Sequence, residues 1–445
     1  MNRADSVSTQ ALVAEDVRFR ASNLYRYYVV SLLLLIAVCN YADRYMLGVL
    51  FPLIKGDLNL SDTQMGFISG AAFTITYALV AVPIAGLSDR ISRKKIITVA
   101  IVIWSIATCL TSLVQNFLHL AIMRLIVGIG EAGSAPPSNS LLSDYFAREE
   151  RTIPVGILGT GASFGIFIGY LAGGMLADSI GWRMTLIAFG LPGLLIAAVF
   201  YLTTKEPPRG GADGLKDTAP PPAVMSTLRD LWEVKTFRNL TLSGALYGLA
   251  SVSFIIWLPS FFVRSHGMDI KTVGATLAFT SGVPSLLGML TGAVIAQRVG
   301  RKSLRAPVLM GAAAIILSGP FFVAVLLLPS AEMALRLYAV PAFLSVLQGA
   351  TLFATILAVA RVRTRAVAMA FSFLIINLGA GIVGPQLVGT SSDLLAGWLG
   401  DESLRYSLIG VAIISSIGAS TFFYMAARHV EQDIADAMVD RPVAS

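Results

Sequence analysis

Cysteine, histidine and charge are all scarce in this sequence. Its 445 residues include two cysteines and three histidines, and 13% of them are charged, whereas a soluble domain has about 25%. Cys39 and Cys109 both lie inside apolar runs, so they cannot form a disulfide framework, and no group of Cys and His has metal-ligand spacing. This composition excludes an ordinary soluble enzyme and a disordered protein. Because the sequence places no nucleophile–base pair and no metal-ligand cluster at one depth of its apolar segments, we expect no cofactor, no metal and no enzymatic activity.

Apolar residues, in contrast, make up 56% of the chain. A membrane-spanning helix needs about 20 of them, and twelve suitable runs recur, bounded by charges or by Gly and Pro. The runs lie at residues 27–54, 62–88, 95–114, 117–145, 152–178, 183–204, 236–264, 272–298, 305–328, 333–361, 365–393 and 403–428. The sequence therefore predicts an all-α integral membrane protein with twelve transmembrane helices in two six-helix bundles.

A polar segment rich in Pro and Gly separates the first six runs from the last six, as is typical of a linker. The predicted organisation is an N-terminal tail (1–26), a first bundle (27–204), a linker (205–235), a second bundle (236–428) and a C-terminal tail (429–445). A similar basic loop occurs in both halves, with Arg90 and Arg298 at matching places 208 residues apart. This predicts a parallel duplication of six helices, related by a pseudo-two-fold axis.

Lys and Arg are concentrated on one side of the predicted helices. The tails, the linker and the loops on that side hold 25 of the 33 Lys and Arg residues, and the opposite loops hold six. Because cytoplasmic loops are enriched in Lys and Arg, both termini are predicted to be cytoplasmic. The same bias accounts for the net charge of +7, so we expect no binding to nucleic acid. We expect the protein to reside in a bacterial inner (plasma) membrane.

Three segments resemble a known family. The loop at residues 89–95 (DRISRKK) is similar to the signature between helices 2 and 3 of the major facilitator superfamily, although Ser92 replaces its usual Gly. Residues 40–45 (NYADRY) and 124–132 (RLIVGIGEA) resemble the Spinster branch of that superfamily. The resemblance covers residues 27–430 and implies transport by alternating access. It also implies a cargo similar to sphingosine phosphate or a lysophospholipid.

Four charged residues fall deep inside predicted spans: Asp43 and Arg44 in the first, and Arg124 and Glu131 in the fourth. A charge at the bilayer centre costs about 2.5–3.5 kcal/mol on insertion scales, so such groups are kept where they face a cavity or a partner. The four charges sum to zero. Pairing Asp43 with Arg124 and Arg44 with Glu131 would make them tolerable, but the sequence does not assign which pairs form.

A buried carboxylic acid beside an arginine can load and release a proton, because burial and the positive charge shift its pKa in opposite directions. We predict that Asp43 and Glu131, with Arg44 and Arg124, couple proton movement to substrate movement. The alternative is a permanently paired network that only fixes packing.

A charge cluster at the cytoplasmic ends of the helices is predicted to form a gate. Asp89 is an acid in an otherwise basic loop, a position that topological charge bias does not explain, and it could cap the N-terminus of a neighbouring helix. The family resemblance implies that it faces the helix beginning near Arg365, with Arg90, Arg93 and Asp144 completing the cluster. The predicted cluster holds the inner side closed and breaks when the two halves rock.

The spans of the second half offer uncharged polar and aromatic side chains. Those predicted to bind substrate are Tyr247, Ser251, Trp257, Thr351, Thr355 and Asn377, opposite Arg44 and Arg124, which suit an anionic head group. We predict an amphipathic or lipid-like anionic substrate, with membrane lipid and protons as further partners of a monomeric protein. Two alternatives stay open: a transporter of small organic anions, sugar acids or drugs, and a non-transporting receptor or scaffold.

Overall fold

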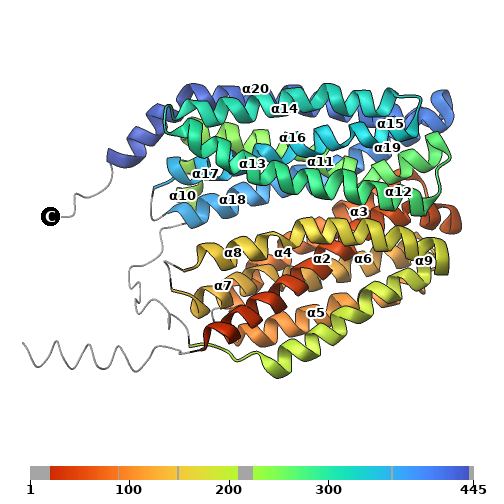
Figure 1. The fold of residues 1–445 in the computed structure, drawn as a ribbon, viewed down its shortest axis with the longest axis horizontal. Helices are drawn as coiled ribbons and strands as arrows, with labels where there is room; N and C mark the ends of the chain where they lie inside the picture. The colour runs from red at the N-terminus through yellow and green to blue at the C-terminus, as the bar shows by residue number, and fades with distance from the viewer. Residues whose placement is uncertain (1–20, 89, 148–149, 209–223, 362–363, 440–445) are drawn as a thin grey trace, which may run out of the picture.

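The computed structural model describes residues 21–88, 90–147, 150–208, 224–361 and 364–439. Throughout these segments the regular structure is helical and includes no strand, as Figure 1 shows. The all-α prediction is therefore confirmed. The predicted gate residue Asp89 lies outside the described residues.

The first half consists of long apolar helices, three of which are interrupted by short breaks. They are α2 (Asn23–Leu58), α3 (Asp62–Ser69) with α4 (Ala71–Ser88), α5 (Arg93–Thr111), α6 (Phe117–Ala132) with α7 (Ala135–Tyr145), α8 (Thr152–Gly159) and α9 (Gly161–Thr203).

The second half begins with a short linker helix, and its longer helices contain two π-helical turns. The elements are α10 (Val224–Glu233), α11 (Lys235–His266), α12 (Ile270–Leu277), η1 (Ala278–Gly282), α13 (Val283–Gly300), α14 (Arg305–Leu327), α15 (Ala331–Leu337), α16 (Ala339–Leu347), α17 (Gly349–Val359), α18 (Arg365–Asn377), η3 (Leu378–Val383), α19 (Gly384–Leu399), η4 (Gly400–Glu402) and α20 (Ser403–Val439).

Ten helical runs among the described residues are long and apolar enough to cross a membrane. Two of them, of 51 and 71 residues, greatly exceed the ~20 residues that one crossing needs. Gly181 interrupts the first with a φ of 77°, and Gly400 interrupts the second with a φ of 54°. Both angles lie in the left-handed region that glycine tolerates best. Counting each of these runs as a pair of crossings gives the twelve transmembrane helices that the sequence predicts.

The helices form two bundles, one from each half of the chain, lying side by side in Figure 1. The bundles are in contact at one end of the molecule, where α3 packs on α19 and α9 packs on α12. They diverge toward the other end, where α2 begins and α20 ends. We call this divergent end the terminal side and the contacting end the closed side.

Glycines bring α9 unusually close to α2. A Cβ atom added to Gly169 would lie 2.7 Å from the carbonyl oxygen of Ala42, which is closer than real Cβ contacts permit. Gly165 similarly faces Tyr41, one turn earlier on the same stripe. Small residues at such a crossing let two helix backbones approach in a membrane. The stripe therefore fixes the part of α2 that carries Asp43 and Arg44.

Candidate functional site

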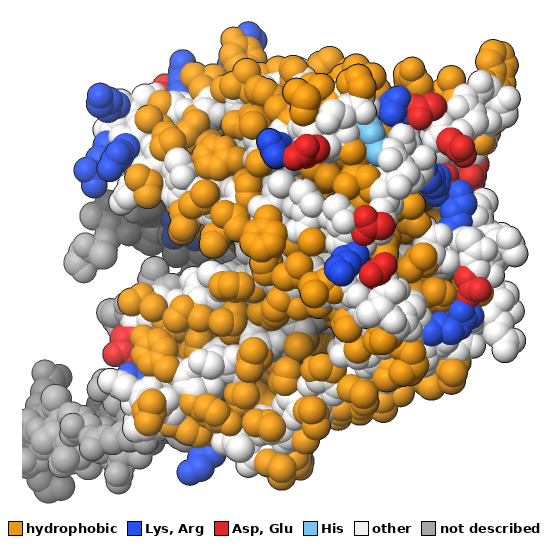
Figure 2. All heavy atoms as spheres, turned by 45° about the vertical axis from the view of Figure 1, so that its right-hand side comes forward, with side chains coloured by type: hydrophobic (Ala, Val, Ile, Leu, Met, Phe, Trp, Pro, Cys, Tyr) orange, Lys and Arg blue, Asp and Glu red, His pale blue; other side chains and the backbone are white. Residues whose placement is uncertain are grey.

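A cavity of about 630 Å³ lies between the two bundles. Its wall comes mainly from α2, α4, α7 and α8 of the first half and from α11, α18 and η3 of the second. Figure 2 shows the surface hollowed between the bundles on the terminal side. The volume falls within the range of about 300–1,000 Å³ that is usual for small-molecule sites.

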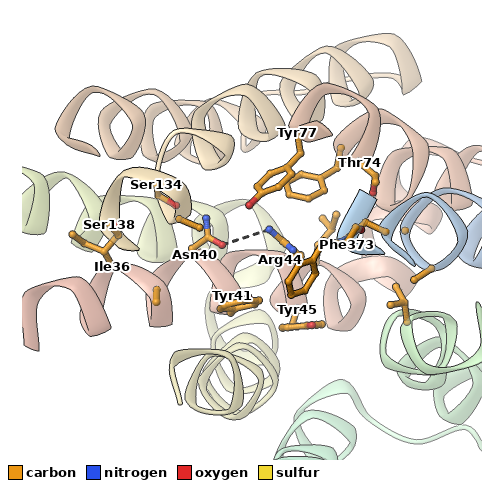
Figure 3. Close-up of a pocket in the computed structure, with 18 of the residues that line it drawn as sticks. Ile36, Asn40, Tyr41, Arg44, Tyr45, Thr74, Tyr77, Ser134, Ser138 and Phe373 are labelled. Atoms are coloured by element: carbon orange, nitrogen blue, oxygen red, sulfur yellow. Dashed lines mark hydrogen bonds between the residues drawn. The ribbon is translucent and has the colours of Figure 1, made fainter. Parts of the chain in front are cut away.

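Arg44 projects from α2 into this cavity and is paired with Glu131. Its Nη2 donates to Glu131 Oε2 at 2.6 Å, and the Glu131 side chain is fully buried whereas that of Arg44 is 28% exposed. Arg44 also approaches Asn40 Oδ1 at 3.5 Å, the dashed line in Figure 3. Its guanidinium lies 4.3 Å from the ring centroid of Phe73, a cation–π distance. One cation thus contacts both the cavity and a carboxylate hidden behind the wall.

Arg124 projects from α6 and also lines the cavity. Its guanidinium lies 5.4 Å from the centroid of the same Phe73 ring, and its Nε is buried without a hydrogen-bond partner. Asp43, which is 4% exposed, instead accepts a hydrogen bond from Thr108 Oγ1 on α5 at 2.8 Å. Of the two pairs considered from the sequence, Arg44 with Glu131 forms, whereas no ion pair within the described ranges joins Asp43 to Arg124.

The two carboxylates are absent from the cavity wall in the described structure, and the two arginines are present in it. An anion in the cavity would therefore meet guanidinium groups first. Glu131 Oε1, like Arg124 Nε, is buried without a hydrogen-bond partner. A buried polar network that is only partly satisfied is less stable than a complete one.

Three of the residues predicted to bind substrate line the cavity: Arg44, Arg124 and Asn377. The structure does not bring the other five to its wall, namely Tyr247, Ser251, Trp257, Thr351 and Thr355. The side chain of Trp257 is fully buried and donates from Nε1 to the carbonyl oxygen of Pro385 at 3.2 Å. Ser251 lines a separate cavity of about 30 Å³. These positions occupy helix faces that turn away from the central cavity, and polarity alone does not reveal that rotation.

Aromatic residues of the cavity escaped the sequence analysis. Tyr41 and Tyr45 stack with their ring centroids 6.3 Å apart, and Tyr77 lies on the opposite side of Arg44, as Figure 3 shows. Phe373 contributes from α18 of the second half. The spacing of four between Tyr41 and Tyr45, one on each side of Arg44, is the signal that could have identified them, because such residues share a helix face.

On the closed side, a buried carboxylate joins the two halves. Asp62 at the start of α3 is 3% exposed and accepts hydrogen bonds from Arg264 Nη1 and Nη2 at 2.7 and 2.5 Å. Lys55 Nζ lies 2.6 Å from the same carboxylate, and Ser392 Oγ lies 2.7 Å from it. Arg264 and Ser392 belong to the second half, so the cluster holds the bundles together.

A second carboxylate on this side caps a helix of the other half. The Asp393 side chain on α19 accepts hydrogen bonds from the backbone N–H groups of Asp62 and Thr63 at 3.0 and 2.7 Å. These N–H groups belong to the first turn of α3, where backbone N–H groups have no hydrogen-bond acceptor within the helix. Sequence analysis did not identify Asp62, Arg264 or Asp393.

On the terminal side, Arg93 is the centre of a cluster within the first half. It forms ion pairs with Asp144 and, at 2.8 Å, with Glu206, which follows α9. Burial alone would raise the pKa of Glu206, but hydrogen bonds from the Lys94 backbone, Arg93 and Ser92 outweigh it and hold that pKa below its usual value. Of the other predicted gate residues, Arg90 is exposed and Arg365 begins α18.

The sequence model of the Major Facilitator Superfamily matches residues 33–385. The chain belongs to this superfamily. An MFS-type efflux pump of Mycolicibacterium smegmatis is 28% identical over 434 residues, covering 96% of this chain and 99% of the relative. A hexuronate transporter of Bacillus subtilis is 27% identical over 403 residues, covering 88% and 94%.

The fold is also close to that of a Spinster-type protein. A bacterial homologue of the human lysosomal transporter Spinster, crystallised inward-facing and unoccupied, has a TM-score of 0.84 and 26% identity, covering 93% of this chain and 99% of that chain. The predicted assignment to the Spinster-like branch of the superfamily is therefore confirmed. The protein is a membrane transporter of the major facilitator type.

Proposed function

We propose that this chain is a proton-coupled secondary transporter that moves an amphipathic, lipid-like anion by alternating access. Both termini lie in the cytoplasm, and the membrane is a bacterial inner membrane. The observation that carries the proposal is the ion pair of Arg44 and Glu131, in which the arginine faces the cavity and the carboxylate is hidden behind it.

This pair supplies a physical coupling between anion and proton. Removing one partner from a buried ion pair leaves an uncompensated charge, which costs about 3–5 kcal/mol. An anion that binds Arg44 in place of Glu131 incurs this cost unless the carboxylate takes up a proton. Conversely, a proton on Glu131 leaves Arg44 available to an anion. Each ligand therefore favours binding of the other, and this linkage is reciprocal.

Asp43 and Arg124 provide a second carboxylate and a second cation in the same region. Asp43 lies within electrostatic reach of Arg124 and Glu131. Arg124 has no carboxylate partner within the described ranges, so it is available to the substrate head group. Hydrogen bonds from a guanidinium to a carboxylate or phosphate are roughly twice as strong as neutral ones.

The rest of the cavity suits an apolar tail. From Arg44 toward the terminal side, its wall includes Leu33 and Ile36 of α2 and Val155 and Leu158 of α8. An amphiphile would place its head at the two arginines and its tail along these side chains. A fully polar solute would leave them in contact with its hydroxyl groups, which gains no apolar burial.

Alternating access requires the closed side to open when the terminal side closes. The contacts of Asp62 with Arg264 and of Asp393 with α3 cross between the bundles and must break in that step. The cavity opens on the terminal side, so the structure corresponds to an inward-facing state in the proposed orientation.

Purified protein in liposomes with an imposed pH gradient tests the function. We expect flux of sphingosine phosphate or a lysophospholipid that depends on the gradient. The proposal fails if neither lipid moves faster than in protein-free liposomes. Asp178→Asn, which changes an exposed carboxylate on α9, is the control and should transport at the wild-type rate.

A second candidate is a transporter of a sugar acid, favoured by the similarity to the Bacillus subtilis hexuronate transporter. Two arginines would bind a sugar carboxylate as readily as a lipid phosphate. The same liposomes loaded with hexuronate separate the two candidates. Hexuronate flux without lipid flux would favour this second function.

A further inference from the structure

The outer surface of the second bundle carries a groove that the transport cavity does not include. It lies between α14 and α20, which form the edge of that bundle farthest from the first half in Figure 1. Its volume is about 410 Å³. Small side chains make it hollow: Ala312 and Ala313 from α14, and Ser420 and Thr421 from α20.

The groove presents an apolar surface despite the hydroxyl groups of Ser420 and Thr421. Ser420 Oγ donates to the carbonyl oxygen of Ala312 at 3.0 Å, and Thr421 Oγ1 donates to that of Ile417 at 2.8 Å. Both hydroxyls therefore satisfy their donors within the protein. Leu309, Ile316 and Ile417 complete an apolar lining that faces the hydrocarbon of the bilayer.

The dimensions of the groove fit one hydrocarbon chain. Adjacent packed helices lie about 8–10 Å apart, so the depression between α14 and α20 is narrow. The eight residues from Ile417 to Tyr424 span about 10 Å along α20. That length fits within one leaflet, which is half of a hydrocarbon core about 30 Å thick.

A positively charged side chain, Arg428, lies at the end of the groove on the terminal side. Arg428 lies one turn beyond Tyr424, with its guanidinium 4.8 Å from the centroid of that ring and its Nη2 3.4 Å from Tyr424 Oη. Arg301 and Lys302, just before α14, are also exposed on this side. Arg305 is paired with Glu431 at 2.9 Å, which neutralises the carboxylate of Glu431.

We propose that this groove binds one acyl chain of an anionic glycerophospholipid, whose phosphate is held at Arg428. The apolar lining accepts the chain, Tyr424 lies at the depth where membrane proteins favour amphipathic rings, and the cation recognises the phosphate. The site belongs to the leaflet on the terminal side. It is separate from the transport cavity and does not depend on the proposed substrate.

The test uses full-length protein in bilayers, with Tyr424→Trp as a fluorescent reporter at the end of the groove. Brominated phosphatidylglycerol should associate with this position about five-fold more strongly than brominated phosphatidylcholine, the preference that one interfacial basic residue gives. The signal is the quenching of the added tryptophan. It is obtained by subtracting the emission of the unsubstituted protein, which contains only the five native tryptophans. Equal quenching by the two lipids would overturn the proposal.

Two further substitutions in the reporter protein separate chain from head group. Ala313→Leu fills the groove and should reduce quenching by both lipids, whereas Ala198→Leu, at an exposed position of α9, should not. Arg428→Gln should abolish the preference for phosphatidylglycerol. Arg336→Gln, which breaks an exposed pair on α15 toward the closed side, should keep that preference. If neither lipid quenches and the protein is dimeric in the bilayer, a second copy covers the groove and the proposal is wrong.

Discussion

Asp62 and Arg264 bind each other across the two bundles. Both terminal nitrogens of Arg264 donate to the Asp62 carboxylate, at 2.7 and 2.5 Å, and Asp62 is 3% exposed. A two-pronged arginine–carboxylate contact is among the strongest polar contacts in proteins, and burial reduces its screening by water. This pair is therefore a strong polar restraint on opening of the closed side.

Asp62→Asn should shift the protein toward a state open on the closed side. The substitution leaves the partly exposed Arg264 and Lys55 without their counter-charge and weakens their hydrogen bonds, which costs about 1–3 kcal/mol in the closed arrangement. Spin labels at Gly56 and Gly397, whose surroundings leave room for a side chain, report the separation of the bundles. Their distance distribution should gain a longer component. Asp57→Asn removes an exposed pair inside the first half and should leave the distribution unchanged.

Arg124→Gln should weaken binding of the anionic substrate. A hydrogen bond to a charged group contributes about 1.5–3 kcal/mol, so the half-saturation concentration should rise by about 10-fold or more. Thr355→Val changes a buried position outside the cavity wall and should leave that concentration within about two-fold of wild type. Concentration-dependent flux into liposomes measures both. Similar values for Arg124→Gln and wild type would remove Arg124 from the binding site.

Gly169→Ala should destabilise the first bundle. The added methyl would lie 2.7 Å from the carbonyl oxygen of Ala42, so α2 and α9 must separate, at the cost of about 1–3 kcal/mol that is typical of overpacking. Gly159→Ala meets open space and should be neutral or slightly stabilising. Thermal unfolding of the two variants in detergent compares these costs. An unchanged midpoint for Gly169→Ala would contradict the close crossing.

Glu206 should make stability depend on pH in the acid range. Its pKa in the folded protein lies below the ordinary value of 4.5, so its contribution is fully present above about pH 4.5 and is lost as pH falls through the folded pKa. Glu206→Gln should lower stability near neutral pH and flatten the acid dependence. Glu233→Gln, in an exposed pair on α10, should preserve the wild-type slope. Unfolding midpoints between pH 7 and pH 3 provide the comparison.

The sequence predicted the membrane architecture well, because its signals are local. Each crossing is a long apolar run, and a charge within such a run is conspicuous, so Asp43, Arg44, Arg124 and Glu131 stood out without a structure. The spacing of Arg124 and Glu131 also places them on one face of their helix. The structure brings Arg44, Arg124 and Glu131 to one region, although only the arginines reach the cavity.

The sequence could not predict how each helix of the second half is rotated. Trp257 is aromatic and Thr351 is polar, and both lie at a suitable depth in their predicted spans. Each is buried against neighbouring helices and does not line the cavity. The closed-side cluster was missed for a different reason. Asp62 resembles an ordinary acid at a helix start, and its partner Arg264 lies 202 residues later, so no local pattern connects them.

Proton flux is the most direct test of the central claim, which is that the carboxylates behind Arg44 and Arg124 couple protons to the substrate. Liposomes containing the wild type, Glu131→Gln or Asp43→Asn should be compared for proton entry triggered by substrate, with a pH-sensitive dye inside. The account predicts substrate-dependent proton movement in the wild type, and its loss in Glu131→Gln and Asp43→Asn while substrate binding persists. Wild-type coupling in both variants would contradict it.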